Sequence, residues 1–221
     1  DTGMPKVIPN LDGSFLTPSV VNLSEKGEVL IGQTALNMLF VEPQRTVKEF
    51  KRDVGTDKVY FIHGNIKVTP AWCQAELLKY IRQSCIKYTG DKLAASKAVI
   101  TVPAYFGEKE RQSVTHSAEM AGIQVLALIN EPTAAGLAYG INEKQGDRLV
   151  IIMDFGGGTF DASLVQYAGG RADAIASLGD KHLGGKDVDD ILLYMVKERF
   201  KNEHSIEVSP DKCPEDFFGI W

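Results

Sequence analysis

Long apolar runs and clustered positive charge are both missing from this 221-residue sequence. No apolar run reaches the length of a transmembrane helix, and the N-terminus lacks the basic and apolar segments of a secretory signal. The net charge is −5 and there is no basic block, which argues against nucleic acid as a partner. We therefore expect a cytoplasmic protein that binds neither membranes nor nucleic acid.

Cysteine is scarce, and its spacing excludes two kinds of site. The three cysteines, Cys73, Cys85 and Cys213, form no CxxC pair, so neither a disulfide framework nor a zinc site is supported. The four histidines are also scattered without the spacing of metal ligands. We expect free thiols and structural histidines in an ordinary globular protein, whose 44% of hydrophobic residues suffices to build a core.

A glycine-rich stretch with an acid on each side is the most informative feature that the sequence does contain. In VIIMDFGGGTFDASLVQY (150–167), an apolar run leads to Asp154, a run of glycines follows, and Asp161 stands near the start of the next segment. Glycines leave room for a ligand beside the backbone, and successive N–H groups can form a concave anion site. We predict a phosphate-binding turn, with these candidate residues: Asp154, Gly156, Gly157, Gly158, Thr159 and Asp161.

Three nucleotide-binding motifs share parts of this stretch and fail on the rest. Asp154, Phe155 and Gly156 match the DFG of protein kinases, but the glycine loop, strand lysine and catalytic loop that precede a kinase DFG are absent. A dinucleotide-binding loop opens a helix, whereas FDASLVQY has the composition of a returning strand. No GK[ST] is present, so a P-loop is excluded. A hairpin with an acidic turn for phosphate and metal remains, beside the alternative of a plain glycine hairpin.

Strands and helices alternate in the middle of the chain. We expect strands at 98–102 and 124–129, each followed by a helix, at 107–121 and 133–139. This order predicts a largely parallel sheet, with its site beyond the carboxyl ends of the strands. Glu131 and Asp154 both lie at such ends. A single acid there most often caps a helix, whereas two acids converging on the glycine turn would make a Mg²⁺ site.

The N-terminal third predicts short strands and helices. Strands are expected at 7–9, 19–22 and 29–31, and a helix at 33–40. Thr46 and Glu49 have the spacing of a capping box, so a further helix is expected to begin there, with Lys51 and Arg52 near its end. A Lys/Arg pair in that position is most often a solvated surface feature that complements the helix dipole.

The remaining elements follow from local signals. A hairpin is expected at 58–68, then a helix with Thr69 as N-cap that ends near Gly90. Its buried stripe is predicted to be Trp72, Leu77, Leu78, Ile81, Cys85 and Ile86. The polar segment 142–147 is the candidate lobe boundary. A strand at 172–177 and a helix from 184 to about 204 complete the order.

Four stretches of the chain carry a family resemblance: VITVPAYFGEKERQ (99–112), NEPTAAGLAYG (130–140), IIMDFGGGTFDASLV (151–165) and HLGGKDVD (182–189). In this order they resemble the ATPase domain of the seventy-kilodalton heat-shock chaperone family, the DnaK type. The resemblance runs from about residue 5 to near 201. It implies an α/β fold, the actin-like (ribonuclease H-like) two-lobed ATPase domain, incomplete at both ends. Residues 1–144 would be the first lobe, without its N-terminal phosphate-loop hairpin, and 145–221 the beginning of the second.

The resemblance implies that ATP or ADP binds as a Mg²⁺ complex. Gly157, Gly158 and Thr159, with the neighbouring Gly156, would hold the β- and γ-phosphates. A second-lobe pair near the nucleotide corresponds to Gly184 and Gly185.

The catalytic roles that the resemblance implies fall on charged side chains. FKRDVG resembles a family segment whose lysine reaches the γ-phosphate and the attacking water, and Lys51 matches that lysine. Asp154 and Glu131 would hold Mg²⁺ largely through water, and Asp161 would place the attacking water or a monovalent ion such as K⁺. The predicted catalytic set is Lys51, Glu131, Asp154 and Thr159, and the predicted metal set is Asp154, Glu131 and Asp161.

Two positions depart from the family pattern. Lys186 stands where most members have glutamate, which leaves that edge of the site undetermined, and Phe155 stands where most have leucine, an apolar replacement.

Three functions stay open at this point. The first is a stress-response chaperone ATPase that couples ATP turnover to the binding and release of unfolded or extended peptides by a domain outside these residues. It implies a J-domain co-chaperone and a nucleotide-exchange factor as partners. The second is a sugar kinase or other phosphotransferase of the same fold, since a fold does not determine a function. The third is a non-catalytic nucleotide-sensing or interaction module.

Overall fold

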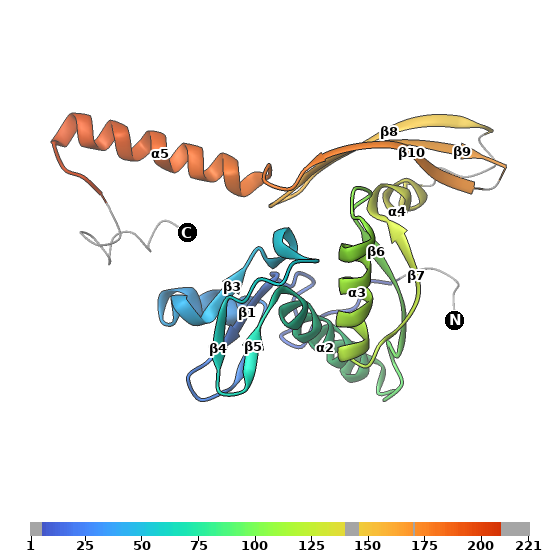
Figure 1. Cartoon of the computed structure of the whole chain (residues 1–221), viewed down its shortest axis with the longest axis horizontal. Coiled ribbons are helices and arrows are strands. Elements are labelled where there is room, and N and C mark those ends of the chain that lie inside the picture. Colours follow the sequence, from blue (N-terminus) through green and yellow to red (C-terminus); the bar gives the residue numbers. More distant parts are fainter. Residues whose placement is uncertain (1–5, 140–145, 170, 209–221) are drawn as a thin grey trace.

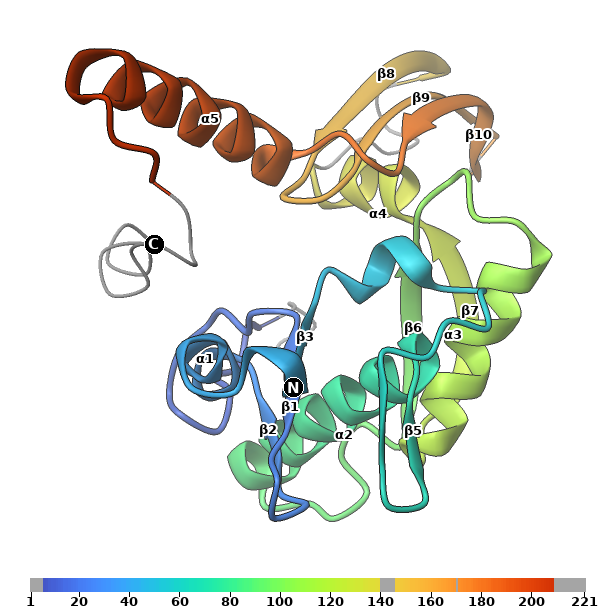
Figure 2. The ribbon, with the colours of Figure 1, turned by 60° about the vertical axis from the view of Figure 1, so that its left-hand side comes forward.

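The computed structural model describes residues 6–139, 146–169 and 171–208, which form two parts. We call residues 6–139 the first part and the described residues from 146 to 208 the second part. Figure 1 shows the second part, a curved sheet followed by a long helix, lying along one side of the first part, and Figure 2 shows the same arrangement after rotation. Both parts mix helices and strands, as predicted. No helix among the described residues is long and apolar enough to cross a membrane.

The first part begins with a small antiparallel sheet. Its strands are β1 (Val20–Leu23), β2 (Val29–Ile31) and β3 (Thr46–Lys48), in the order β2-β1-β3. The helix predicted at 33–40 is present as α1 (Gln33–Asn37) with a 3₁₀ turn, Met38–Phe40. The strand predicted at 7–9 is wrong, because that segment pairs with no other strand and Val7 is 72% exposed.

The helix predicted to begin at Thr46 is also wrong, because the Thr46 hydroxyl is bonded to Glu42 and to Asn22 of β1. Thr46 Oγ1 donates to the carbonyl of Glu42 at 2.9 Å and accepts a hydrogen bond from Asn22 Nδ2 at 3.0 Å. The segment is therefore held as β3 beside β1. Glu49 follows in the left-handed region, with φ of 59°, and turns the chain into the 3₁₀ helix η3 (Phe50–Asp53).

The hairpin and the long helix predicted from local sequence signals are both confirmed. The hairpin comprises β4 (Phe61–His63) and β5 (Ile66–Val68), and the helix is α2 (Pro70–Thr89). Thr69 Oγ1 accepts a hydrogen bond from the Trp72 N–H at 3.2 Å, and Gly90 ends the helix with φ of 71°. The predicted buried stripe is wrong: Ile81 is 41% exposed and the other five members are only partly buried. The buried residues of α2 are instead Pro70, Cys73, Ala75 and Ser84, and Cys73 packs in the core with β1–β3.

The centre of the first part contains one parallel strand pair, as predicted, but the expectation of a largely parallel sheet is wrong, because the other strand pairs among the described residues are antiparallel. The central elements are β6 (Lys97–Val102), α3 (Glu108–Met120), β7 (Gln124–Asn130) and α4 (Glu131–Ala138). β6 and β7 pair in parallel, and β7 leads directly into α4. Figure 2 shows α4 beneath the sheet of the second part, so the carboxyl end of β7 is directed toward that sheet.

The second part is a three-stranded antiparallel sheet and one helix. Its elements are β8 (Arg148–Phe155), β9 (Phe160–Ala168), β10 (Arg171–Asp180) and α5 (Gly185–His204). The order is β10-β9-β8, which confirms that FDASLVQY returns as a strand beside β8. Alternate residues of β9 are buried from Asp161 to Tyr167, on the face that α4 covers. Residues 142–145 of the predicted lobe boundary and the tail from 209 lie outside the described residues.

Candidate functional site

The glycine turn connects β8 to β9 as a closed hairpin. Asp154 lies opposite Asp161 across the two strands, and the Gly156 N–H donates to the Thr159 carbonyl at 2.9 Å. A Cβ atom placed on Gly157 meets nothing within 4 Å, so the space beside the turn is open. Within the described part of the chain, the N–H groups of Gly157 and Gly158 have no acceptor. They are thus available to an anion, as a phosphate-binding turn requires.

The second predicted glycine pair packs directly on this turn. The Gly185 N–H donates to the Gly156 carbonyl at 3.0 Å, and the Lys186 N–H donates to the Gly157 carbonyl at 2.9 Å. A Cβ on Gly184 would lie 2.6 Å from the backbone nitrogen of Gly158, closer than packed atoms approach. The two segments therefore need glycine at position 184 to come together.

Gly184→Ala is expected to weaken ATP binding and to lower the melting temperature, because the added methyl group must push the turn away. Overpacking of this kind costs about 1–3 kcal/mol. Gly185→Ala is the matched control for the melting temperature only, because its Cβ would lie 3.7 Å from Gly157 Cα, an ordinary contact, whereas Gly185 is itself predicted to lie beside the nucleotide. Calorimetric titration with Mg·ATP and thermal unfolding of the full-length protein measure both effects. Equal melting temperatures of the two variants would contradict the packing argument.

Lys51 and Glu131, two of the predicted catalytic residues, form an ion pair. Lys51 Nζ lies 3.0 Å from Glu131 Oε1 and 3.3 Å from Oε2. Lys51 is on η3, which is anchored in the core by Phe50 within it and by Val54 just after it, each only 3% exposed. Glu131 is in the first turn of α4, where the helix dipole favours a carboxylate. The fold therefore holds a lysine and an acid from distant sequence positions side by side.

Asp161 is held by two serines. It is 6% exposed, and its Oδ1 accepts hydrogen bonds from Ser163 Oγ at 2.7 Å and Ser177 Oγ at 2.9 Å. Its Oδ2 is buried and has no hydrogen-bond partner among the described residues. An orphaned carboxylate oxygen of this kind fits a cation or an ordered water.

The described residues contain no cluster of three acids, histidines or cysteines that could hold a metal ion by themselves. The metal roles of Asp154, Glu131 and Asp161 therefore stay predictions. The residues still fit Mg²⁺, because this ion keeps several waters and binds through one or two carboxylates together with substrate phosphates. Asp154 at the turn and the free oxygen of Asp161 are carboxylate groups of that kind.

Tyr105 belongs to the site, although the sequence reasoning did not select it. Burial raises the pKa of Tyr105, and the nearby carboxylates of Glu131, Asp161 and Asp154 raise it further. Its ring packs edge-on against Phe106, with centroids 5.6 Å apart. The available signal was its place just beyond the carboxyl end of β6, where sites of parallel sheets gather.

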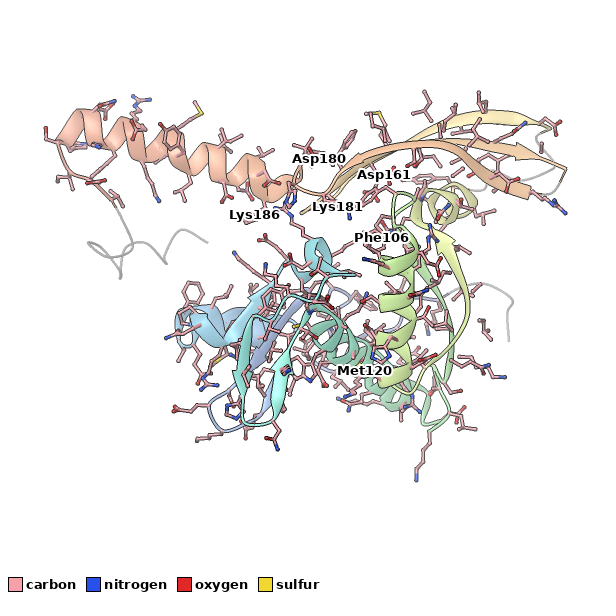
Figure 3. All side chains as sticks on the ribbon, in the orientation of Figure 1. Phe106, Met120, Asp161, Asp180, Lys181 and Lys186 are labelled. Carbon is pink, nitrogen blue, oxygen red and sulfur yellow. The ribbon has the colours of Figure 1, made fainter. Side chains whose placement is uncertain are left out.

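Ion pairs of Arg52 with Asp187 and of Lys181 with Glu110 join the first part to the second, and neither was predicted. Arg52 NH2 lies 2.7 Å from Asp187 Oδ2, and this hydrogen bond holds the pKa of the Asp187 carboxyl below its ordinary value of 3.8. Lys181 Nζ lies 2.9 Å from Glu110 Oε1 and also stands over the Phe106 ring. Figure 3 marks Lys181 and Phe106 at the junction of the two parts. The Lys/Arg pattern predicted a solvated surface pair, but the Arg52 side chain is only 14% exposed.

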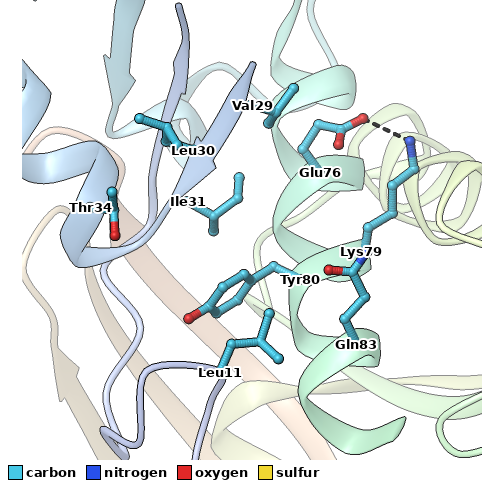
Figure 4. A pocket seen from close by; sticks show the side chains of 9 residues that line it. All are labelled: Leu11, Val29, Leu30, Ile31, Thr34, Glu76, Lys79, Tyr80 and Gln83. Atoms are coloured by element: carbon cyan, nitrogen blue, oxygen red, sulfur yellow. Dashed lines mark hydrogen bonds and ion pairs between the residues drawn. The ribbon is translucent and has the colours of Figure 1, made fainter. Parts of the chain in front are cut away.

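A separate pocket of about 360 Å³ lies between β2, α1 and α2. Leu11 and Tyr80 line it, and the ion pair of Lys79 with Glu76 stands at its side (Figure 4). None of the predicted site residues lines this pocket.

Comparison with known proteins identifies close relatives. The family described as Hsp70 protein matches residues 1–215. The Chaperone protein DnaK of Thermotoga neapolitana is 41% identical over 210 residues, which cover 95% of this chain and 35% of the relative. The Chaperone protein DnaK of Thermosipho africanus is 40% identical over 207 residues, 94% of this chain and 34% of the relative. The chain thus spans about a third of the length of these relatives.

Proposed function

The chain belongs to the Hsp70 family, as a segment of the ATPase domain of a DnaK-type chaperone, and we propose that its glycine turn binds the phosphates of ATP for hydrolysis. One observation carries the proposal: the Gly184 segment packs on the turn, while the N–H groups of Gly157 and Gly158 have no acceptor among the described residues. The Lys51–Glu131 pair lies close by, since the next residue, Arg52, donates to the Gly158 carbonyl at 2.9 Å. We further propose the actin-like, two-lobed arrangement, with lobes at 1–144 and 145–221.

The residues of this chain act by positioning and by charge, because phosphoryl transfer asks for little covalent chemistry from the protein. The N–H groups of Gly157 and Gly158 hold phosphate oxygens. Lys51, fixed by Glu131, orients the attacking water beside the γ-phosphate and stabilises the negative charge that develops there. Asp161, fixed by its serines, places that water or a K⁺ ion.

Asp154 and Glu131 would hold Mg²⁺ beside the phosphates, largely through water, with Asp161 as a further candidate metal ligand. The ion would supply positive charge to neutralise the phosphate oxygens during transfer. Lys186 adds a further positive charge at the start of α5, where its ammonium pairs with Asp190. This side chain therefore offers no carboxylate at the edge of the site, unlike the glutamate of most family members.

The chaperone cycle itself is part of the proposal. ATP turnover at this site would control the binding and release of unfolded or extended peptides by another domain. A J-domain co-chaperone and a nucleotide-exchange factor would act on it, in the cytoplasm. The relatives are chaperones by name, and this likeness supports the proposal for the chain.

Phosphate release by the purified full-length protein tests this function. We expect slow hydrolysis of Mg·ATP to ADP and free phosphate that a panel of sugars does not change. Phosphate transferred to a sugar would favour the phosphotransferase alternative and contradict the proposal. Calorimetric binding of ATP without any turnover would instead favour a nucleotide-sensing module.

A further inference from the structure

Arg52 is the side chain that connects η3 to the phosphate-binding turn. Its Nε donates to the Gly158 carbonyl at 2.9 Å. Its NH2 and NH1 groups lie 2.7 Å and 3.4 Å from the two oxygens of Asp187. One planar guanidinium thus binds the turn and the first turn of α5 at the same time, a geometry that arginine offers and lysine does not.

The bond network continues from Asp187 back to the turn. Asp187 Oδ2 also accepts a hydrogen bond from the Gly184 N–H at 2.8 Å. Gly184 is the residue whose backbone packs against Gly157 and Gly158. The guanidinium therefore contacts the turn directly, through the Gly158 carbonyl, and indirectly, through Asp187, which binds the Gly184 N–H.

We propose that Arg52 is a positioning residue that sets the spacing between Lys51 and the phosphate-binding turn. Arg52 follows Lys51 directly on η3, and Phe50 beside them is buried in the core. A fixed distance from Arg52 to Gly158 therefore fixes where the Lys51 ammonium stands relative to bound phosphate. The inference rests on the proposed function, because it assigns Arg52 a part in ATP hydrolysis at that site.

A second ion pair between the same two parts provides the comparison. Lys181 and Glu110 also join the second part to the first, with side chains 38% and 20% exposed. Neither side chain forms a hydrogen bond to the turn residues 156–159 among the described residues. Loss of this pair would loosen the junction of the two parts without releasing the turn. An effect of Arg52 variants that the Glu110 variant does not share would therefore come from the turn and not from a loosened junction.

The test compares Arg52→Ala, Arg52→Lys, Asp187→Asn and the control Glu110→Gln in the full-length protein. Misplacement of about 1 Å costs on the order of a hundredfold in rate. We therefore expect Arg52→Ala to lower kcat by about tenfold to a hundredfold, with a smaller change in the KM for ATP. Arg52→Lys should keep the ion pair and thermal stability but regain only part of kcat, because lysine cannot bind Gly158 and Asp187 as a fork. Glu110→Gln should leave kcat near the parental value.

Hydrogen exchange in the absence of nucleotide supplies a readout that does not depend on turnover. Arg52→Ala should raise exchange of the hydrogen-bonded amides of Gly156, Gly185 and Lys186, which hold the turn together, and Glu110→Gln should not. Equal loss of kcat in Arg52→Ala and Glu110→Gln, or unchanged exchange at the turn in Arg52→Ala, would overturn the inference. If the parental protein hydrolyses no ATP, the proposed function fails, and the exchange comparison still shows whether Arg52 holds the turn.

Discussion

Asp154→Asn is expected to lower the rate of ATP hydrolysis by about a hundredfold or more while leaving the fold intact. Asp154 is the penultimate residue of β8, two positions before Gly156, and lies opposite Asp161 across the hairpin. Removal of a charge that organises Mg²⁺ and the phosphates costs several kilocalories per mole in the transition state, on the order of a hundredfold in rate. Asparagine keeps the size of the side chain, so the change is one of charge.

The fold should tolerate this substitution. Asp154 is exposed, and among the described residues its carboxylate forms no hydrogen bond or ion pair. Asp173→Asn is the matched control, because Asp173 is an exposed acid on β10 of the same sheet, opposite Gln166 and away from the turn. Single-turnover hydrolysis and thermal unfolding of the full-length protein measure rate and stability separately. Parental turnover in Asp154→Asn would refute the assignment of this acid to the site.

Lys51→Ala should lower kcat by about a hundredfold, with a much smaller loss of ATP affinity. The charge of Lys51 matters most when negative charge develops on the γ-phosphate and the attacking water, so its loss affects the transition state more than binding. Stability should change little, because the lysine side chain is 46% exposed and exposed ion pairs contribute about 0–1 kcal/mol.

Lys58→Ala provides the matched control for Lys51. Lys58 forms an ion pair with Asp53 at 2.8 Å on the same loop, and its side chain is 51% exposed. This variant also removes one lysine and one ion pair, but it leaves the Lys51–Glu131 pair in place. Single-turnover rates, combined with calorimetric ATP binding, separate the two lysines. An equal, small effect of both substitutions on the single-turnover rate would show that Lys51 is an ordinary surface lysine.

Local sequence signals predicted the elements whose partners are close in the chain. Thr69 and Pro70 start α2, and Gly90 ends it, because capping and the left-handed region involve only neighbouring residues. The glycine hairpin was predicted for the same reason. The helix predicted to begin at Thr46 is absent, because the Thr46 hydroxyl is bonded to Asn22 and Glu42, which lie 24 and 4 positions away. A capping-box spacing does not contain that information.

For the candidate site, too, features within one short segment could be predicted from the sequence, whereas contacts between distant segments could not. The sequence by itself determined the family, the glycine turn and its acids, since these depend on residue types in order along one hairpin. Only the tertiary structure decided that Lys51 meets Glu131, that Tyr105 lies among the carboxylates, and that Arg52 reaches the turn. Arg52 and Asp187 are 135 positions apart. Such contacts depend on how the two parts pack on each other, and that packing is set by the summed burial of many side chains rather than by any short motif.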